Sequence, residues 1–63
     1  MSLEILQKLY YIEIIDSIEV YGHTEAPIEY IYEALKYFIK KEQYEYCITL
    51  KTYLKEIKKE NVI

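Results

Sequence analysis

Side chains that carry most enzymatic chemistry are scarce in this sequence of 63 residues. It has no arginine and no tryptophan, and it holds one cysteine, one histidine and one aspartate. A lone cysteine cannot form an internal disulfide, so the fold needs no oxidising compartment. The beginning of the chain also lacks the basic start and apolar core of a secretory leader. We therefore expect a cytoplasmic protein.

The few reactive residues do not predict a catalytic or metal site. A nucleophile needs a base beside it, but His23 falls in a turn, whereas Cys47 falls on the apolar face of a helix, where it is typical of a small core residue. Glu13, Asp16 and Glu19 form a carboxylate group that is compatible with a hard cation. We favour ordinary surface pairing instead, with lysines at the end of the last helix. No enzyme activity, metal or cofactor is expected.

Length and charge restrict the possible folds and partners. A chain of 7.7 kDa forms one small domain and buries only about 60% of the surface that its unfolded form exposes. Its 52% hydrophobic and 30% charged residues, with short apolar runs, exclude a disordered tail and a membrane span. The net charge of −3 argues against a partner selected for its phosphates. Abundant isoleucine, lysine and tyrosine match A/T-rich codons and favour a low-GC bacterium, its phage or an archaeal virus as the source. We expect the chain to be encoded by a phage or another mobile element.

The single glycine and the single proline fall in one short segment. Gly22 fits a helix C-cap because glycine adopts a positive φ without steric cost. Thr24 fits a helix N-cap, with Pro27 inside the first turn. The segment therefore predicts the end of a first helix, at residues 3–21, and a second helix that begins near residue 25.

The second helix, residues 25–41, has the clearest apolar periodicity. Its apolar residues recur at the three- and four-residue spacing of one helical face: Ile28, Ile31, Tyr32, Leu35, Phe38 and Ile39. Glutamates come first and lysines last, which is the order that the helix dipole favours.

A third helix is predicted at residues 43–60, because the apolar repeat loses its phase after Lys40. The apolar residues beyond that point are Cys47, Leu50, Leu54 and Ile57, with Tyr46 and Tyr53 beside them. A break between Lys40 and Gln43 restores a consistent face. The second and third helices therefore form an antiparallel hairpin with a very short turn.

Residues 3–21 are apolar nearly all round, so their packing is harder to predict. A helix of this kind is normally covered on several sides, and three helices of this size offer cover on only one or two. A second interpretation pairs residues 10–21 as strands, because Ile12, Ile14, Ile18 and Val20 alternate with acids over short stretches. We favour a helix, and hence an all-α fold in which the first helix packs on the hairpin.

Exposed apolar and aromatic positions predict association with a protein. Tyrosine is enriched at interfaces, and tyrosines recur at seven-residue spacing on the flanks of both hairpin helices: Tyr30, Tyr37, Tyr46 and Tyr53. Ile5, Leu9 and Ile12 of the first helix are candidates for a homodimer contact. The alternative is that the first helix covers one tyrosine flank while the hydroxyls of the other face water. We expect a small non-enzymatic adaptor or inhibitor whose partner is a protein, with a homodimer as one form.

The alternative function is nucleic-acid binding through the lysines of the third helix, Lys51, Lys55, Lys58 and Lys59. Lysines interleaved with tyrosines suit backbone neutralisation and base stacking. Arginine is absent, however, and Glu45 and Glu56 lie among these lysines. A solvated, lysine-rich face is therefore the preferred interpretation.

Residues 34–57 resemble the UVR motif, a short helical hairpin of excision-repair and stress-response proteins. The resemblance rests on the pairs Tyr44-Glu45, Cys47-Ile48 and Leu50-Lys51, followed by Leu54 and Ile57. The Arg-Asp step of the motif is Lys51-Thr52 in this chain, and its paired alanines are the larger Cys47-Ile48. The resemblance implies an antiparallel hairpin that serves in protein interaction.

Overall fold

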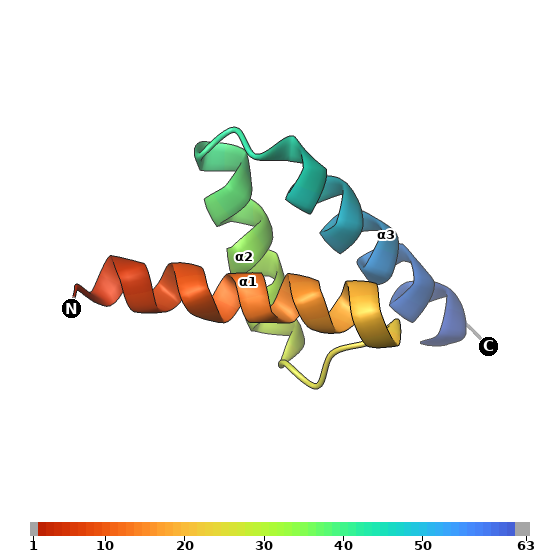
Figure 1. Cartoon of the computed structure of the whole chain (residues 1–63). Helices are drawn as coiled ribbons and strands as arrows, with labels where there is room; N and C mark the ends of the chain where they lie inside the picture. Colours follow the sequence, from red (N-terminus) through yellow and green to blue (C-terminus); the bar gives the residue numbers. More distant parts are fainter. Residues whose placement is uncertain (1, 62–63) are drawn as a thin grey trace.

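Three helices make up the fold in a computed structural model that describes residues 2–61, with side chains described through Lys58. The helices are α1 (Leu3–Tyr21), α2 (Ile28–Lys40) and α3 (Tyr44–Asn61). α2 and α3 form the predicted hairpin, and α1 crosses it and contacts both helices (Figure 1). The described residues contain no strand, so residues 10–21 are helical and the strand interpretation is wrong. The predicted all-α class is confirmed.

Both ends of α1 are capped by side-chain or backbone groups close in sequence. Ser2 is the N-cap, and its hydroxyl oxygen accepts a hydrogen bond from the Ile5 N–H at 3.3 Å. Gly22 has φ 79° and donates its N–H to the Ile18 carbonyl at 2.9 Å. The predicted glycine cap is confirmed, because this left-handed conformation favours glycine.

The α1–α2 loop differs from the prediction, because α2 begins at Ile28 and Thr24 is not its N-cap. The Thr24 N–H donates to the Tyr53 hydroxyl oxygen at 3.2 Å, and that hydroxyl donates to the Thr24 carbonyl at 3.2 Å. The Thr24 hydroxyl oxygen accepts from the Ala26 N–H at 3.3 Å. These bonds keep the loop non-helical up to Pro27, which is the N-cap rather than a residue of the first turn.

The α2–α3 turn forms where the phase of the apolar repeat predicted a break. The Glu42 N–H donates to the Ile39 carbonyl at 3.0 Å, and the Gln43 N–H donates to the Phe38 carbonyl at 2.9 Å. This pair of bonds is the Schellman arrangement, which requires a left-handed residue after the helix. Glu42 occupies that position with φ 59°.

Among the side chains that the structure describes, nine form a single core to which each helix contributes three: Tyr11, Ile14, Ile15, Ile31, Ala34, Phe38, Cys47, Leu50 and Leu54. The predicted core positions Cys47, Leu50 and Leu54 of α3 are confirmed. On α2 the buried face is turned toward Ala34, which is fully buried, while Ile28 and Ile39 are exposed.

The cause of this rotation is that α1 and α3 cover α2 from two sides. The Tyr11 ring of α1 lies 5.4 Å from the Tyr37 ring and 6.4 Å from the Phe38 ring, measured between centroids. The Tyr46 ring of α3 lies 4.8 Å from the Phe38 ring. The flank of α2 that carries Ala34 and Tyr37 is therefore drawn toward the core, although the sequence pattern placed it outside.

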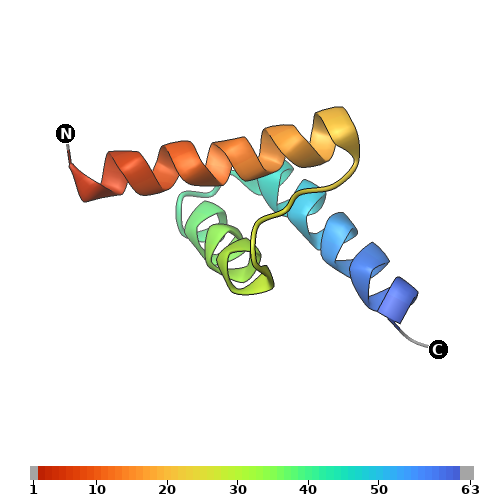
Figure 2. The same cartoon turned by 90° about the horizontal axis from the view of Figure 1, so that it is seen from below.

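The first half of α1 extends past the hairpin, which makes the molecule elongated (Figures 1 and 2). The radius of gyration is 11.8 Å, compared with about 10.6 Å for a compact domain of this length. The three core residues of α1 lie around its middle, at Tyr11, Ile14 and Ile15, so the segment before Tyr11 supplies no core residue.

Candidate interaction surface

Four large apolar side chains in the first half of α1 remain exposed. Leu3 is 72% exposed, Ile5 50%, Leu6 51% and Leu9 51%. We call these four residues the α1 apolar face. Exposed apolar residues are unremarkable when they are scattered, but a contiguous group on one helix segment marks an interaction site.

Helix geometry explains why the hairpin does not cover this face. The buried stripe of α1 includes Tyr11 and Ile14, and helical spacing continues it backward to Gln7 and Glu4. Both of these residues are polar, so apolar packing against the hairpin ends at Tyr11. Before that point the apolar side chains lie on the other sides of the helix.

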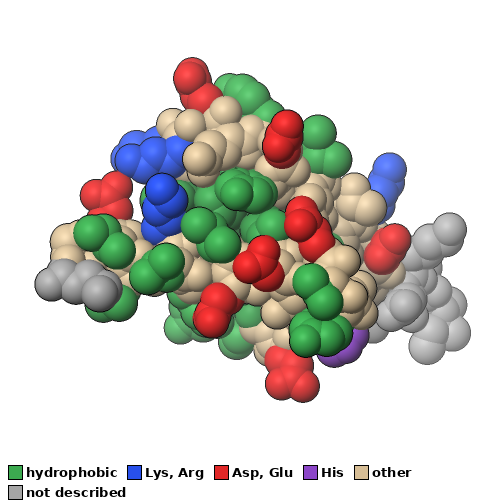
Figure 3. Space-filling model, viewed as in Figure 1, with side chains coloured by type: hydrophobic (Ala, Val, Ile, Leu, Met, Phe, Trp, Pro, Cys, Tyr) green, Lys and Arg blue, Asp and Glu red, His purple; other side chains and the backbone are tan. Residues whose placement is uncertain are grey.

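The space-filling view shows how side chains of each kind are distributed over one side of the molecule (Figure 3). Hydrophobic side chains lie over the first half of α1, at the centre of this side and again near the end of α1, while acidic side chains are scattered over both halves of the view (Figure 3). Along the helix, the α1 apolar face is followed by the exposed acids Glu13, Asp16 and Glu19 and then by the exposed Val20 and Tyr21.

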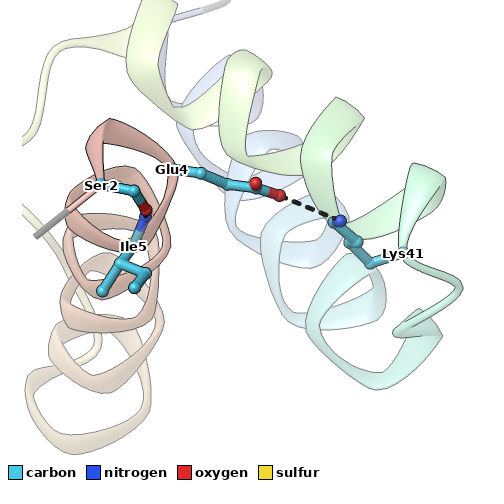
Figure 4. A network of polar contacts seen from close by, with 4 residues as sticks. All are labelled: Ser2, Glu4, Ile5 and Lys41. Carbon is cyan, nitrogen blue, oxygen red and sulfur yellow. Dashed lines mark hydrogen bonds and ion pairs between the residues drawn. The ribbon is translucent and has the colours of Figure 1, made fainter.

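An ion pair holds the first turn of α1 against the hairpin. The Glu4 Oε1 atom lies 3.1 Å from the Lys41 Nζ atom, and Ile5 points away from this pair (Figure 4). The Lys41 Nζ atom also lies 5.8 Å from the centroid of the Tyr37 ring. The Lys41 ammonium group donates a hydrogen bond to the Glu4 carboxylate, and this bond raises the pKa of the ammonium group. The pair orients α1 without using any side chain of the α1 apolar face.

The predicted tyrosine surface does not form one continuous patch. Tyr30 is 45% exposed and lies edge-on to Tyr10, with 5.7 Å between ring centroids. Tyr37 and Tyr46 are partly buried against the core, and Tyr53 is partly buried with its hydroxyl bonded to the α1–α2 loop. Three of the four predicted tyrosines therefore contribute to packing.

The three predicted residues of α1 are also separated by the structure. Ile5 and Leu9 belong to the α1 apolar face, whereas Ile12 is partly buried and packs against the core. The prediction omitted Leu3 and Leu6, which are at least as exposed as Leu9. The three-residue spacing of Leu3, Leu6 and Leu9 is the sequence signal that indicates this face.

An open groove of about 810 Å³ lies between the second half of α1 and the α1–α2 loop. Its lining includes Glu13, Asp16 and Glu25, together with His23. Among the residues that the structure describes, no group of three or more histidine, cysteine or acidic side chains is arranged to hold a metal ion. Cys47 is buried in the core and does not line this groove.

The expected pairing of the carboxylates with the lysines of α3 is not observed for Lys55 and Lys58. Neither lysine forms an ion pair with Glu13, Asp16 or Glu19, and Lys59 lies outside the described side chains. The last turn of α1 also contains no basic residue. Among the described side chains, Glu13, Asp16 and Glu19 therefore have no ion-pair partner on α3.

Within the described part of the chain, none of the helices has the length and hydrophobicity needed to cross a membrane. Comparison with known proteins finds no matching family model, no matching curated protein and no matching solved structure.

Proposed function

We propose that this chain is a small, non-enzymatic protein–protein interaction module, an adaptor or inhibitor that binds through the α1 apolar face. The observation that carries the proposal is the exposure of Leu3, Ile5, Leu6 and Leu9 on a helix segment that projects from the bundle. Each apolar side chain of this size stabilises a complex by about 1.5–3 kcal/mol when it passes fully from water into an apolar contact. Side chains that are half exposed in the free protein gain part of this free energy when a partner buries their remaining apolar surface.

The edge of the surface supports the same conclusion. Tyr10 and Tyr30 lie beside the α1 apolar face and present two aromatic rings in an edge-to-face pair. Tyrosine suits the rim of an interface because its ring is apolar while its hydroxyl remains compatible with water. The resemblance of residues 34–57 to the UVR hairpin adds a second, independent argument for a role in protein interaction.

Nucleic-acid binding receives less support from the arrangement of charges. Lys51, Lys55 and Lys58 are exposed on α3, but the exposed residues Glu45 and Glu56 share that helix. The whole chain carries a net charge of −3. A phosphate-directed surface needs an excess of positive charge over an extended area.

Site-specific photocrosslinking in the cells that make the protein tests the proposal. A benzophenone amino acid replaces Leu6 in one variant and Lys51 in a control variant, because both side chains are exposed and lie on different helices. We expect a covalent adduct with a protein from position 6 and none from position 51. The adduct should disappear when Leu9→Glu is added to the first variant. Equal adducts at both positions, or none at position 6, would contradict the proposal.

A further inference from the structure

We propose that the partner of the α1 apolar face is the same face of a second copy, with the two α1 helices antiparallel and overlapping only in their first halves. This inference rests on the proposed function. In this arrangement Leu6 of one copy lies against Leu6 of the other on a twofold axis. Leu3 of each copy lies against Leu9 of the other.

The distribution of charge along α1 selects this register. Glu13 and Asp16 are exposed seven residues after Leu6 and Leu9, and therefore lie on the same side of the helix two turns later. Parallel helices in register would place these acids against their own copies. Antiparallel helices that overlap along their full length would place the acids against the leucines. Only an antiparallel overlap of the first halves joins apolar side chains and leaves Glu13 and Asp16 of both copies outside the contact.

The shape of the molecule permits this contact. The hairpin packs on the buried side of α1, around Tyr11, Ile14 and Ile15. Before Tyr11 the hairpin reaches α1 through the Glu4–Lys41 ion pair and the Tyr10–Tyr30 contact, which leave Leu3, Leu6 and Leu9 exposed (Figures 1 and 2). A twofold axis through Leu6 therefore places the two hairpins at opposite ends of the dimer and on opposite sides of the paired helices. The projecting first half of α1 meets no part of the partner other than the partner's own first half.

The area available fits a weak dimer. The chain has an accessible surface of 5059 Å², compared with about 4,300 Å² for a typical compact monomer of its mass. An overlap of about ten helical residues is about 15 Å long. A contact of this length is short for a specific protein–protein interface. We therefore expect reversible association with a dissociation constant between about 10 μM and 1 mM.

Disulfide trapping tests the register. Leu3→Cys and Leu9→Cys chains, one of them labelled with heavy isotopes, are mixed in equal amounts and oxidised with glutathione. We expect the mixed Leu3→Cys/Leu9→Cys disulfide to exceed both homodimers, because these positions face each other only in the antiparallel register. The unmodified chain is the control, since its single cysteine, Cys47, is buried. The proposal would be overturned if most disulfides joined two Leu3→Cys chains or two Leu9→Cys chains. It would also be overturned if these variants crosslinked no faster than a control with the exposed substitution Glu29→Cys.

Light scattering at protein concentrations from about 10 μM to 1 mM tests the association itself. We expect Leu6→Glu to raise the dissociation constant at least tenfold, whereas Val20→Glu, at an exposed position on the second half of α1, leaves it within about twofold. Far-UV circular dichroism confirms that both variants remain folded. A monomer at every concentration would overturn this inference. A heterologous adduct in the photocrosslinking experiment would then still support the proposed function, so the two failures are distinguishable.

Discussion

The hydroxyl of Tyr53 joins two segments that are 29 residues apart in the sequence. It accepts a hydrogen bond from the Thr24 N–H and donates one to the Thr24 carbonyl, so a single side chain satisfies both backbone groups of a loop residue. Sequence reasoning assigned Thr24 to a helix N-cap, which requires only local partners. The long-range bond could not be predicted, because it depends on where α3 passes the loop.

Replacing Tyr53 with phenylalanine should lower the free energy of unfolding by about 1 kcal/mol, because two hydrogen bonds are lost while the ring still packs. Urea denaturation followed by circular dichroism measures this change. Tyr46→Phe is the matched control, since Tyr46 is also partly buried and its contact with Phe38 is through the ring. A larger loss for Tyr46→Phe than for Tyr53→Phe would contradict the role given to the Tyr53 hydroxyl.

Tyr11 couples the stability of the core to alkaline pH. Burial raises the pKa of its phenol, and the negative charge of Glu33 raises it further. Because the folded-state pKa lies above the unfolded value of about 10, the folded state holds the proton more tightly. This contribution to stability is fully present below about pH 10 and is lost as the pH rises through the folded-state pKa.

Tyr11→Phe should therefore reduce the loss of stability between neutral and strongly alkaline pH. The measurement is the urea midpoint of both proteins at pH 8 and above about pH 10, the ordinary phenol pKa. The other tyrosines titrate in both proteins, so the difference between the two proteins isolates Tyr11. An identical fall in both midpoints would show that Tyr11 carries no such dependence.

At the scale of elements, the α2–α3 turn places a residue other than glycine in a left-handed conformation. Glu42 adopts φ 59°, a left-handed conformation that costs an ordinary L-residue about 1–2 kcal/mol. The hydrogen bonds from Glu42 and Gln43 to the end of α2 require this conformation. The phase of the apolar repeat located the turn without a glycine, but it could not show which residue would be left-handed.

Glu42→Gly should raise the free energy of unfolding by about 1 kcal/mol, because glycine adopts a positive φ without a Cβ clash. Thermal unfolding followed by circular dichroism measures the gain as a higher Tm. Glu42→Ala separates the loss of charge from the loss of Cβ, and it should leave Tm nearly unchanged. A gain of equal size from alanine would indicate that charge, not conformation, is the cause.

α1 shows the limit of periodicity as a predictor. Its residues are apolar nearly all round, so the sequence supports several buried faces equally well. Ile12 and Leu9 were predicted together as surface residues, but only Leu9 is exposed, because the hairpin covers the side of α1 that includes Ile12. Apolar packing of α1 against the hairpin ends before Gln7 and Glu4, because these two residues continue the buried stripe and are polar. The sequence alone does not show this limit, because it does not show which stripe of α1 is buried.

At the scale of the whole molecule, no pair of helices contains a complete core. Tyr11, Ile14 and Ile15 of α1 close the side of the hairpin that would otherwise be open to water. Phe38, which is fully buried, packs against rings from both α1 and α3. A chain of this size has little stability in reserve, so the loss of one third of the core should not be tolerated.

A peptide of residues 23–63 should therefore be mostly unfolded at 25 °C. Far-UV circular dichroism should show a helix signal per residue well below that of the full chain. Addition of a peptide of residues 2–22 should restore part of this signal, because it returns the missing core residues. A cooperative thermal transition of the 23–63 peptide alone would show that the hairpin folds independently and would contradict this view.

The sequence by itself determined the class and order of the elements. Gly22 and the phase slip after Lys40 are local signals, and they set where α1 ends and where the α2–α3 turn falls. The tertiary structure alone decided which faces are buried, because burial depends on how three helices cross. It moved Ala34 and Tyr37 inward, bonded Tyr53 to the loop and left Leu3, Ile5, Leu6 and Leu9 exposed. The α1 apolar face lies before Tyr11, where the side of α1 that faces the hairpin becomes polar at Gln7 and Glu4. No local pattern in the sequence shows which side of α1 faces the hairpin.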